Sequence, residues 1–204
     1  MAELDNLLED IRDCRICEPE LPLGARPVLQ CAQGARILIA GQAPGSRVHA
    51  SGIPFDDASG DRLRAWMGIN RELFYDPGLV AILPMGFCYP GTGKSGDLPP
   101  RPECAATWRA RLLRLLPRIQ LTLVLGQYAQ TWHFDEPATS LTARVADWRK
   151  YLLESTPAVL PLPHPSPRNN RWLKQNPWFE NELLPQLRSR INQVTGTTAS
   201  DADE

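Results

Sequence analysis

The chain has 204 residues, of which 43% are hydrophobic and 22% are charged, so it can bury a core and is not a disordered protein. Its formal net charge of -1 argues against a uniformly basic protein that coats nucleic acid, although a local basic groove remains compatible with it. No apolar run approaches the ~18 residues that cross a membrane, and the acidic start MAELDNLLED lacks the basic and apolar segments of a secretory signal. We therefore expect a cytoplasmic protein with no membrane partner.

Hydrophobic periodicity predicts short strands that alternate with helices. In chain order, we expect a helix over 3–12, a strand over 35–41, a helix capped by Ser59 and stopped at Gly68, a strand over 80–85, a helix over 104–117, a strand over 120–126 with a helix through about Trp132, a helix (or, less favoured, a strand pair) over 141–154, a strand over 158–165 and a helix over 176–194. This alternation predicts an α/β fold, a single-domain three-layer sandwich over 1–192 with a central, mainly parallel four-stranded sheet. The last residues, TGTTASDADE, are small, polar and acidic, and we expect a disordered tail over 193–204.

Three of the predicted strands end in unusual loops, with the sequences GQAPGSRVH, MGFCYPG and PHPSPRNN. Because ligands sit at the carboxyl ends of parallel strands, we expect these loops to lie along one edge and build one site. The segment GTGKS at 91–95 does not match a phosphate-binding loop, since Cys88 occupies the place of the first glycine and no helix follows. The segment GQAPG at 41–45 lacks the glycine spacing of a dinucleotide fingerprint and is, taken alone, a tight turn.

The third loop holds His164 between two prolines, which stiffen the backbone around it. A rigid histidine at the end of a strand is a candidate proton donor or oxyanion stabiliser, with a structural histidine as the alternative. Basic residues and amides then surround Trp172, a composition that suits a nucleic-acid backbone and a wedge into a base stack. The alternative is a solvated loop that leads into a helix.

The segment 52–60 places Phe55 beside two carboxylates. A phenylalanine near a polar loop can stack on a planar ligand. Asp56 and Asp57 are candidate bases for a water molecule, or else a charge pair at the start of a helix.

Five cysteines in a chain without an export signal do not indicate a disulfide framework. Cys14 and Cys17 form a C-x-x-C pair, and Cys88 and Cys104 are separated by fifteen residues rich in Gly and Pro. Four thiolates suit either tetrahedral zinc or a [4Fe–4S] cluster, and the spacing leaves both open, as it leaves four unrelated buried thiols. Cys31 has no obvious partner and is expected to be an ordinary thiol.

Together, these loops and cysteines resemble the uracil-DNA glycosylase superfamily over roughly residues 10–190, and most of all its iron–sulfur branch first known from thermophiles. The segment 41–60 is similar, without a gap, to the first motif of that branch. The segment HPSPRN at 164–169 is similar to the His-Pro-Ser motif of the superfamily, and the cysteine spacing is similar to the cluster pattern of the branch.

The resemblance implies a monofunctional DNA glycosylase that flips uracil out of DNA and hydrolyses its N-glycosidic bond, which initiates base-excision repair. It implies that Phe55 stacks on uracil and that His164 binds the uracil oxygen on which charge develops. It also implies that Asp57, with Asp56 as the fallback, and Gln42 act on the attacking water.

The resemblance further implies a substrate pocket, a DNA-contacting loop and a structural [4Fe–4S] cluster, with no catalytic metal. The other pocket residues would be Gly41, Ala43, Pro84, Met85 and Gly86; the DNA contacts Ser166, Arg168, Asn169, Arg171 and Lys174; and the cluster ligands Cys14, Cys17, Cys88 and Cys104. We expect a monomer whose partner is DNA containing uracil or a related deaminated base.

Three departures from the family pattern bear on activity. Gln42 stands where the iron–sulfur branch usually has Glu, Ala43 where another branch has Asp, and Pro84 where an Asn usually reads the amide edge of uracil. Asp57 best fits the place of the working Asp in a further branch. These changes leave a second hypothesis, a lesion-binding protein with little or no turnover, and the cysteines alone would allow a structural metal-binding module.

Overall fold

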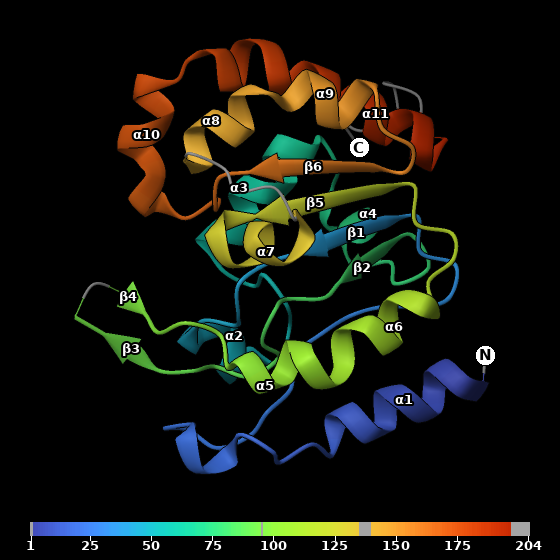
Figure 1. The fold of residues 1–204 in the computed structure, drawn as a ribbon, viewed down its shortest axis with the longest axis vertical. Coiled ribbons are helices and arrows are strands. Elements are labelled where there is room, and N and C mark those ends of the chain that lie inside the picture. Colours follow the sequence, from blue (N-terminus) through green and yellow to red (C-terminus); the bar gives the residue numbers. More distant parts are fainter. Residues whose placement is uncertain (1, 95, 135–139, 197–204) are drawn as a thin grey trace.

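A computed structural model describes residues 2–94, 96–134 and 140–196, in which helices flank a central parallel sheet (Figure 1). The strands are β1 (Ile37–Ala40), β2 (Val80–Ile82), β5 (Leu121–Leu125) and β6 (Ala158–Leu162). Their order in the sheet is β2-β1-β5-β6, and each neighbouring pair is parallel. This arrangement confirms the predicted α/β sandwich with a four-stranded sheet. From β1 the chain first forms β2 on one side of β1 and then crosses to form β5 on the other side. The strand order therefore reverses direction at β1, and parallel sheets commonly bind ligands at such a point.

Eleven α-helices, four shorter or wider helical turns and one small hairpin are described in these residues. The helices are α1 (Ala2–Arg12), α2 (Ser46–Ser51), α3 (Ala58–Met67), α4 (Arg71–Phe74), α5 (Pro102–Cys104), α6 (Ala110–Arg114), α7 (Gly126–His133), α8 (Leu141–Ala146), α9 (Trp148–Leu153), α10 (Asn170–Gln175) and α11 (Leu184–Thr195). The turns are Glu18–Glu20 and Pro167–Asn169, which are 3-10, and Ala105–Arg109 and Phe179–Leu183, which are π-helical; the hairpin is β3 (Thr92–Gly93) with β4 (Gly96–Asp97).

The sheet divides the core into two layers because successive side chains of a strand point to opposite faces. Ile37 and Ile39 of β1 pack with α3, α9 and α11 on one face. Leu38, between them, packs on the other face with α1 and α6. All four residues of β1 are buried, as expected for a strand of a parallel sheet that is covered on both sides.

Some element boundaries differ from those that the sequence predicts. Helix α3 ends at Gly68 as predicted, with φ 67°, but the residue that caps its start is Asp57 and not Ser59. The segment 141–154 is helical, as favoured, but Asp147 (φ -81°, ψ 18°) divides it into α8 and α9. The terminal helix α11 runs to Thr195, so residues 193–195 of the predicted tail are helical. Gly196 caps the end of this helix, and residues 197–204 lie outside the described part of the chain.

Within residues 2–94, 96–134 and 140–196, the structure has no helix with the length and apolar character needed to cross a membrane.

Candidate active site at the carboxyl ends of the strands

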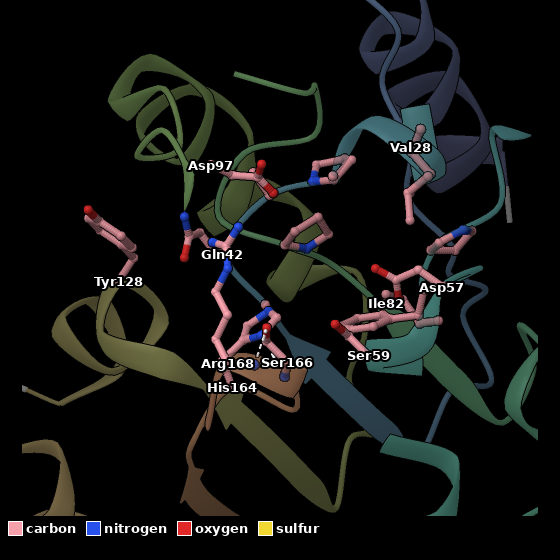
Figure 2. A pocket seen from close by; sticks show the side chains of 18 of the residues that line it. Val28, Gln42, Asp57, Ser59, Ile82, Asp97, Tyr128, His164, Ser166 and Arg168 are labelled. Carbon is pink, nitrogen blue, oxygen red and sulfur yellow. Dashed lines mark hydrogen bonds between the residues drawn. The ribbon is translucent and has the colours of Figure 1, made fainter. Parts of the chain in front are cut away.

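A cavity of about 620 Å³ opens at the edge of the sheet where β1, β2, β5 and β6 end. The segments after all four strands contribute to its lining, and the predicted loops after β1 and β6 contribute half of the lining residues. Figure 2 shows these side chains facing one another across the pocket. The sequence-predicted residues that line it are Gly41, Gln42, Ala43, Phe55, Asp57, Pro84, His164, Ser166, Arg168 and Asn169.

Other predicted pocket residues lie beside the cavity rather than in its lining. The Met85 and Gly86 N–H groups donate to the Gly41 and Gln42 carbonyls at 2.9 and 3.0 Å. They therefore contribute backbone bonds that hold the loop after β2 against the loop after β1. The Asp56 carboxylate is directed away, since it forms an ion pair of 3.0 Å with Arg71.

The predicted DNA contacts are divided between the pocket and α10. Arg171 and Lys174 are exposed on α10, outside the pocket lining. Trp172, the suggested wedge, is instead half-buried against the core. Its indole N–H donates to Thr142 Oγ1 at 2.8 Å, and its ring lies edge-on to that of Phe179. The tryptophan therefore anchors α10 to the body of the protein.

His164 is held in one orientation by its own loop. The Ser166 backbone N–H donates to His164 Nδ1 at 3.2 Å, and Asn169 Nδ2 donates to the His164 carbonyl at 2.7 Å. Because Nδ1 accepts a hydrogen bond, the ring proton of the neutral imidazole is on Nε2. Burial lowers the pKa of His164 from its ordinary value, an effect that the carboxylates of Asp57 and Asp97 oppose. The side chain is thus a neutral donor.

Arg62 of α3 holds the part of this loop that follows His164. Arg62 donates to the Ser166 carbonyl at 3.0 Å and to Asn170 Oδ1 at 2.7 Å. Arg62 was not predicted from the sequence, because nothing in the helix pattern indicates that this basic position would reach the loop after β6. The bracing fixes the loop relative to α3 and to Phe55, which precedes that helix.

Phe55 lies over the glycine at the end of β1. Its ring is so close to Gly41 that a Cβ at that glycine would lie 3.4 Å from Phe55 Cζ. The Phe55 backbone has a left-handed φ of 55°, which is unusual for a residue with a bulky side chain. A Cβ on Gly60 would overlap the Phe55 carbonyl, so glycine is required there. The ring is therefore fixed as a flat wall of the pocket, as its predicted stacking role needs.

Asp57 has two functions available to its side chain. Its Oδ1 accepts from the Gly60 N–H at 2.9 Å and so caps α3. The same side chain lines the cavity, and its charge acts on His164. The cap holds the carboxylate at the pocket wall, so one oxygen organises the helix while the other is the candidate acceptor for a proton or a water.

The β3–β4 hairpin was not predicted, and it adds a further wall. Gln42 Nε2 donates to the Leu98 carbonyl at 3.2 Å. The guanidinium of Arg168 lies against Gly96, whose φ of 130° excludes most side chains and where a Cβ would overlap it. The hairpin therefore contacts both main loops, and it places Asp97 in the pocket lining. The only sequence signal was the Ser-Gly pair at 95–96, which is typical of a turn but does not indicate where the acid would point.

The four predicted cluster ligands line one small pocket on the other side of the loop after β2. Burial, followed by the charges of the other thiols, raises the pKa of Cys104 to about 12, although the Phe87 N–H donates to its sulfur at 3.3 Å. Burial likewise raises the pKa of Cys88 to about 11. Four thiolates in such a site need a cationic partner. Among the described residues, no three Cys, His, Asp or Glu side chains converge as they would on a single metal ion. Four cysteine thiolates are a donor set that suits either tetrahedral zinc or an iron–sulfur cluster.

Cys31 belongs to the core, as expected. It is buried among residues of α1, β1 and α6, and burial raises the pKa of its thiol to about 11.

A buried cation lies behind the floor of the pocket. Arg109 is 1% exposed, and it donates to the Leu83 carbonyl at 2.8 Å and to His133 Nε2 at 2.7 Å. Burial lowers the pKa of Arg109 to about 10, and burial together with the Arg109 charge lowers the pKa of His133 to about 3. His133 is therefore neutral and accepts the hydrogen bond, and the pair fixes the chain as it leaves β2 toward Pro84.

The chain matches a known protein family. The family described as the uracil DNA glycosylase superfamily matches residues 29–188, which include the loops after β1, β2 and β6. The match begins after Cys14 and Cys17, so it supports the pocket and not the proposed cluster branch.

Proposed function

The chain belongs to the uracil DNA glycosylase superfamily, and we propose that it hydrolyses the N-glycosidic bond of uracil in DNA and so initiates base-excision repair. The observation that carries the proposal is the pocket: a neutral His164 with its donor on Nε2, the Phe55 ring and the Asp57 carboxylate all line one cavity at the strand ends. Such a pocket accepts a flat base that has left the helix stack, which is how enzymes reach a glycosidic bond.

The base would lie against the Phe55 ring, with a carbonyl oxygen directed at His164. As the C1′–N1 bond breaks, both of its electrons leave with uracil, and negative charge develops on that oxygen. A neutral Nε2–H stabilises this charge without transferring its proton, because it is fixed before the reaction by the hydrogen bonds to Ser166 and Asn169.

The attacking water would be oriented by Asp57 and by polar groups of the loop after β1. Its oxygen adds to C1′, and Asp57 accepts the released proton. Gln42 is neutral and its amide nitrogen is engaged with the Leu98 carbonyl, so it can orient a water through its oxygen but cannot accept the proton. This division favours Asp57 over Gln42, and the ion pair with Arg71 places Asp56 second.

The flipped nucleotide would be held by the loop after β6. Ser166, Arg168 and Asn169 line the pocket, while Arg171 and Lys174 extend the polar surface along α10. Contacts of basic side chains with phosphates release counterions, so we expect affinity to fall as salt rises. The proposed substrate is DNA that contains uracil or a related deaminated base. We propose that the protein acts on it as a monomer in the cytoplasm, as the sequence predicts.

The four cysteines would hold a [4Fe–4S] cluster that ties the N-terminal segment to the loop after β2. Its contribution when bound is structural, and the proposed chemistry needs no catalytic metal. The support is the shared pocket of Cys14, Cys17, Cys88 and Cys104, and the sulfur-directed N–H of Phe87. Purified protein should contain iron and sulfide and absorb broadly near ~400 nm. A colourless protein with one zinc ion would refute the cluster.

The first test is excision from an oligonucleotide with one uracil, single-stranded or paired with guanine, followed by alkali to cut at abasic sites. We expect strand cleavage that depends on uracil and on His164. The alternative is a lesion-binding protein. It is suggested by Gln42 and Pro84, which stand where the family pattern usually has an acid and an asparagine. Folded protein that binds uracil-DNA but leaves it uncut would establish that alternative.

A further inference from the structure

Asp97 is a pocket residue to which neither the family resemblance nor the proposed reaction assigns a role. It ends β4 and lines the same cavity as Asp57; in Figure 2 it lies at the top of the view and Asp57 at the right. The two carboxylates therefore border the same space, which a flipped nucleotide would fill. Any role for Asp97 at this place rests on the proposed glycosylase function and deepens it.

The carboxylate of Asp97 is held by the hairpin and by the loop after β1. Its Oδ1 accepts from Thr92 Oγ1 at 3.3 Å, and the Thr92 hydroxyl is in turn 2.5 Å from that of Tyr89. Its Oδ2 faces Gly45, where a Cβ would come within 3.4 Å of it. The neighbouring Leu98 is fixed by the Gln42 amide. These contacts fix the carboxylate before any substrate binds.

The position of Asp97 separates it from the base. Asp97 is exposed, whereas His164 is only partly accessible, and in Figure 2 the side chains of Gln42 and Arg168 lie between them. The base would be directed toward His164, deeper in the pocket. Asp97 would then face the part of the nucleotide nearer to the DNA strand, which is the deoxyribose. The charge of Asp97 also reaches His164. A carboxylate that lies nearer to the sugar than to the uracil oxygen attracts the charge on the sugar more strongly than it opposes the charge that leaves with uracil.

We propose that Asp97 stabilises the positive charge that develops on the deoxyribose during bond cleavage. When the C1′–N1 bond breaks, the electron pair leaves on uracil and the positive charge is shared by C1′ and O4′. Water then adds to C1′ and its proton passes to Asp57, while Asp97 neither gains nor loses a proton. Bound DNA excludes water from the mouth of the pocket, which strengthens the attraction.

The test is Asp97→Asn, which preserves shape and removes charge, with Asp147→Asn as a matched control at an exposed position outside the pocket. Single-turnover excision should slow by about 100-fold in Asp97→Asn, the lower end of the range for one preorganised electrostatic contact, because Asp97 is exposed. Binding of uracil-DNA should become equal or tighter, because an acid near the phosphates is gone. The control should match the unaltered protein in both.

A second readout does not depend on turnover. The unaltered protein should bind DNA with a cationic pyrrolidine in place of the uracil nucleotide about 10-fold tighter than DNA with a neutral tetrahydrofuran, since the ring charge resembles that of the transition state. Asp97→Asn should lose this preference, while Asp147→Asn keeps it. An undiminished excision rate, or an unchanged preference for the cationic ring, overturns the assignment. If the unaltered protein releases no uracil, the proposed function fails; a preference for the cationic ring that Asp97→Asn abolishes would then still show that Asp97 faces the sugar.

Discussion

Substitution of Asp57 should separate the helix-capping function of this residue from its chemical function. Asparagine keeps a side-chain oxygen that can accept from the Gly60 N–H, whereas alanine removes the 2.9 Å bond. Asn and Asp are comparable N-caps, so Asp57→Asn should lose only the charge at the start of α3, about 0.3–1 kcal/mol. Asp57→Ala should lose about 1 kcal/mol for the cap in addition.

The effect on catalysis should follow a different order. Both variants lack a carboxylate to accept the proton of the attacking water, so both should slow single-turnover excision by ~10²–10⁴-fold, the usual contribution of a general base. A further 1 kcal/mol of destabilisation lowers the melting temperature of a protein of this size by only about 2–4 °C. Both variants therefore remain folded at 25 °C, and lost activity cannot be attributed to unfolding.

The assays are thermal unfolding and single-turnover excision on the same preparations. The expected result is a melting temperature that is lower in Asp57→Ala than in Asp57→Asn, with similar and severe losses of excision rate. An Asp57→Asn variant that excises uracil at the unaltered rate would show that the residue is a cap only, and the proton would need another acceptor.

Three further outcomes are expected from the electrostatics of the structure. Because burial lowers the pKa of His164, protonation of this histidine should reduce excision only at a lower pH than for an ordinary histidine; a rate that follows a histidine with an ordinary or raised pKa contradicts the neutral-donor role. His133 has a pKa of about 3 in the folded protein. Below pH 6.5 this histidine therefore binds a proton in the unfolded state but not in the folded state, so the free energy of unfolding decreases as the pH is lowered. At pH 5 the loss is roughly 2 kcal/mol, from ~1.36 kcal/mol per pH unit, and urea unfolding of His133→Gln should show a smaller loss. Finally, Arg171→Ala and Lys174→Ala should each reduce the slope of log affinity against log salt by about 1; unchanged slopes would remove α10 from the DNA-binding surface.

The strands and their order of appearance were predictable because they are short, apolar and bounded by turn residues. All four predicted strands are present, and the expectation that loops at their carboxyl ends form one site follows from the parallel topology alone. Phe55 and His164 both line the cavity, as predicted. Their roles in stacking on the base and donating to it come from the family resemblance and stay predictions.

The remaining features depend on contacts between distant segments, which periodicity does not encode. The hairpin that carries Asp97 is fixed by Gln42, Arg168 and the conformation of Gly96, and no helix or strand pattern links these residues. Trp172 was suggested as a wedge because of its basic neighbours. It is instead half-buried, because it lies on the side of α10 that faces the core.

The most direct test of the proposed function is the amount of free uracil released when uracil-DNA is in large excess over protein. A glycosylase should release several uracil molecules per molecule of protein, with an abasic site in the DNA for each one, and His164→Ala should lose most of this release. Folded protein that forms a stable complex with the DNA and releases no uracil would contradict the proposed function.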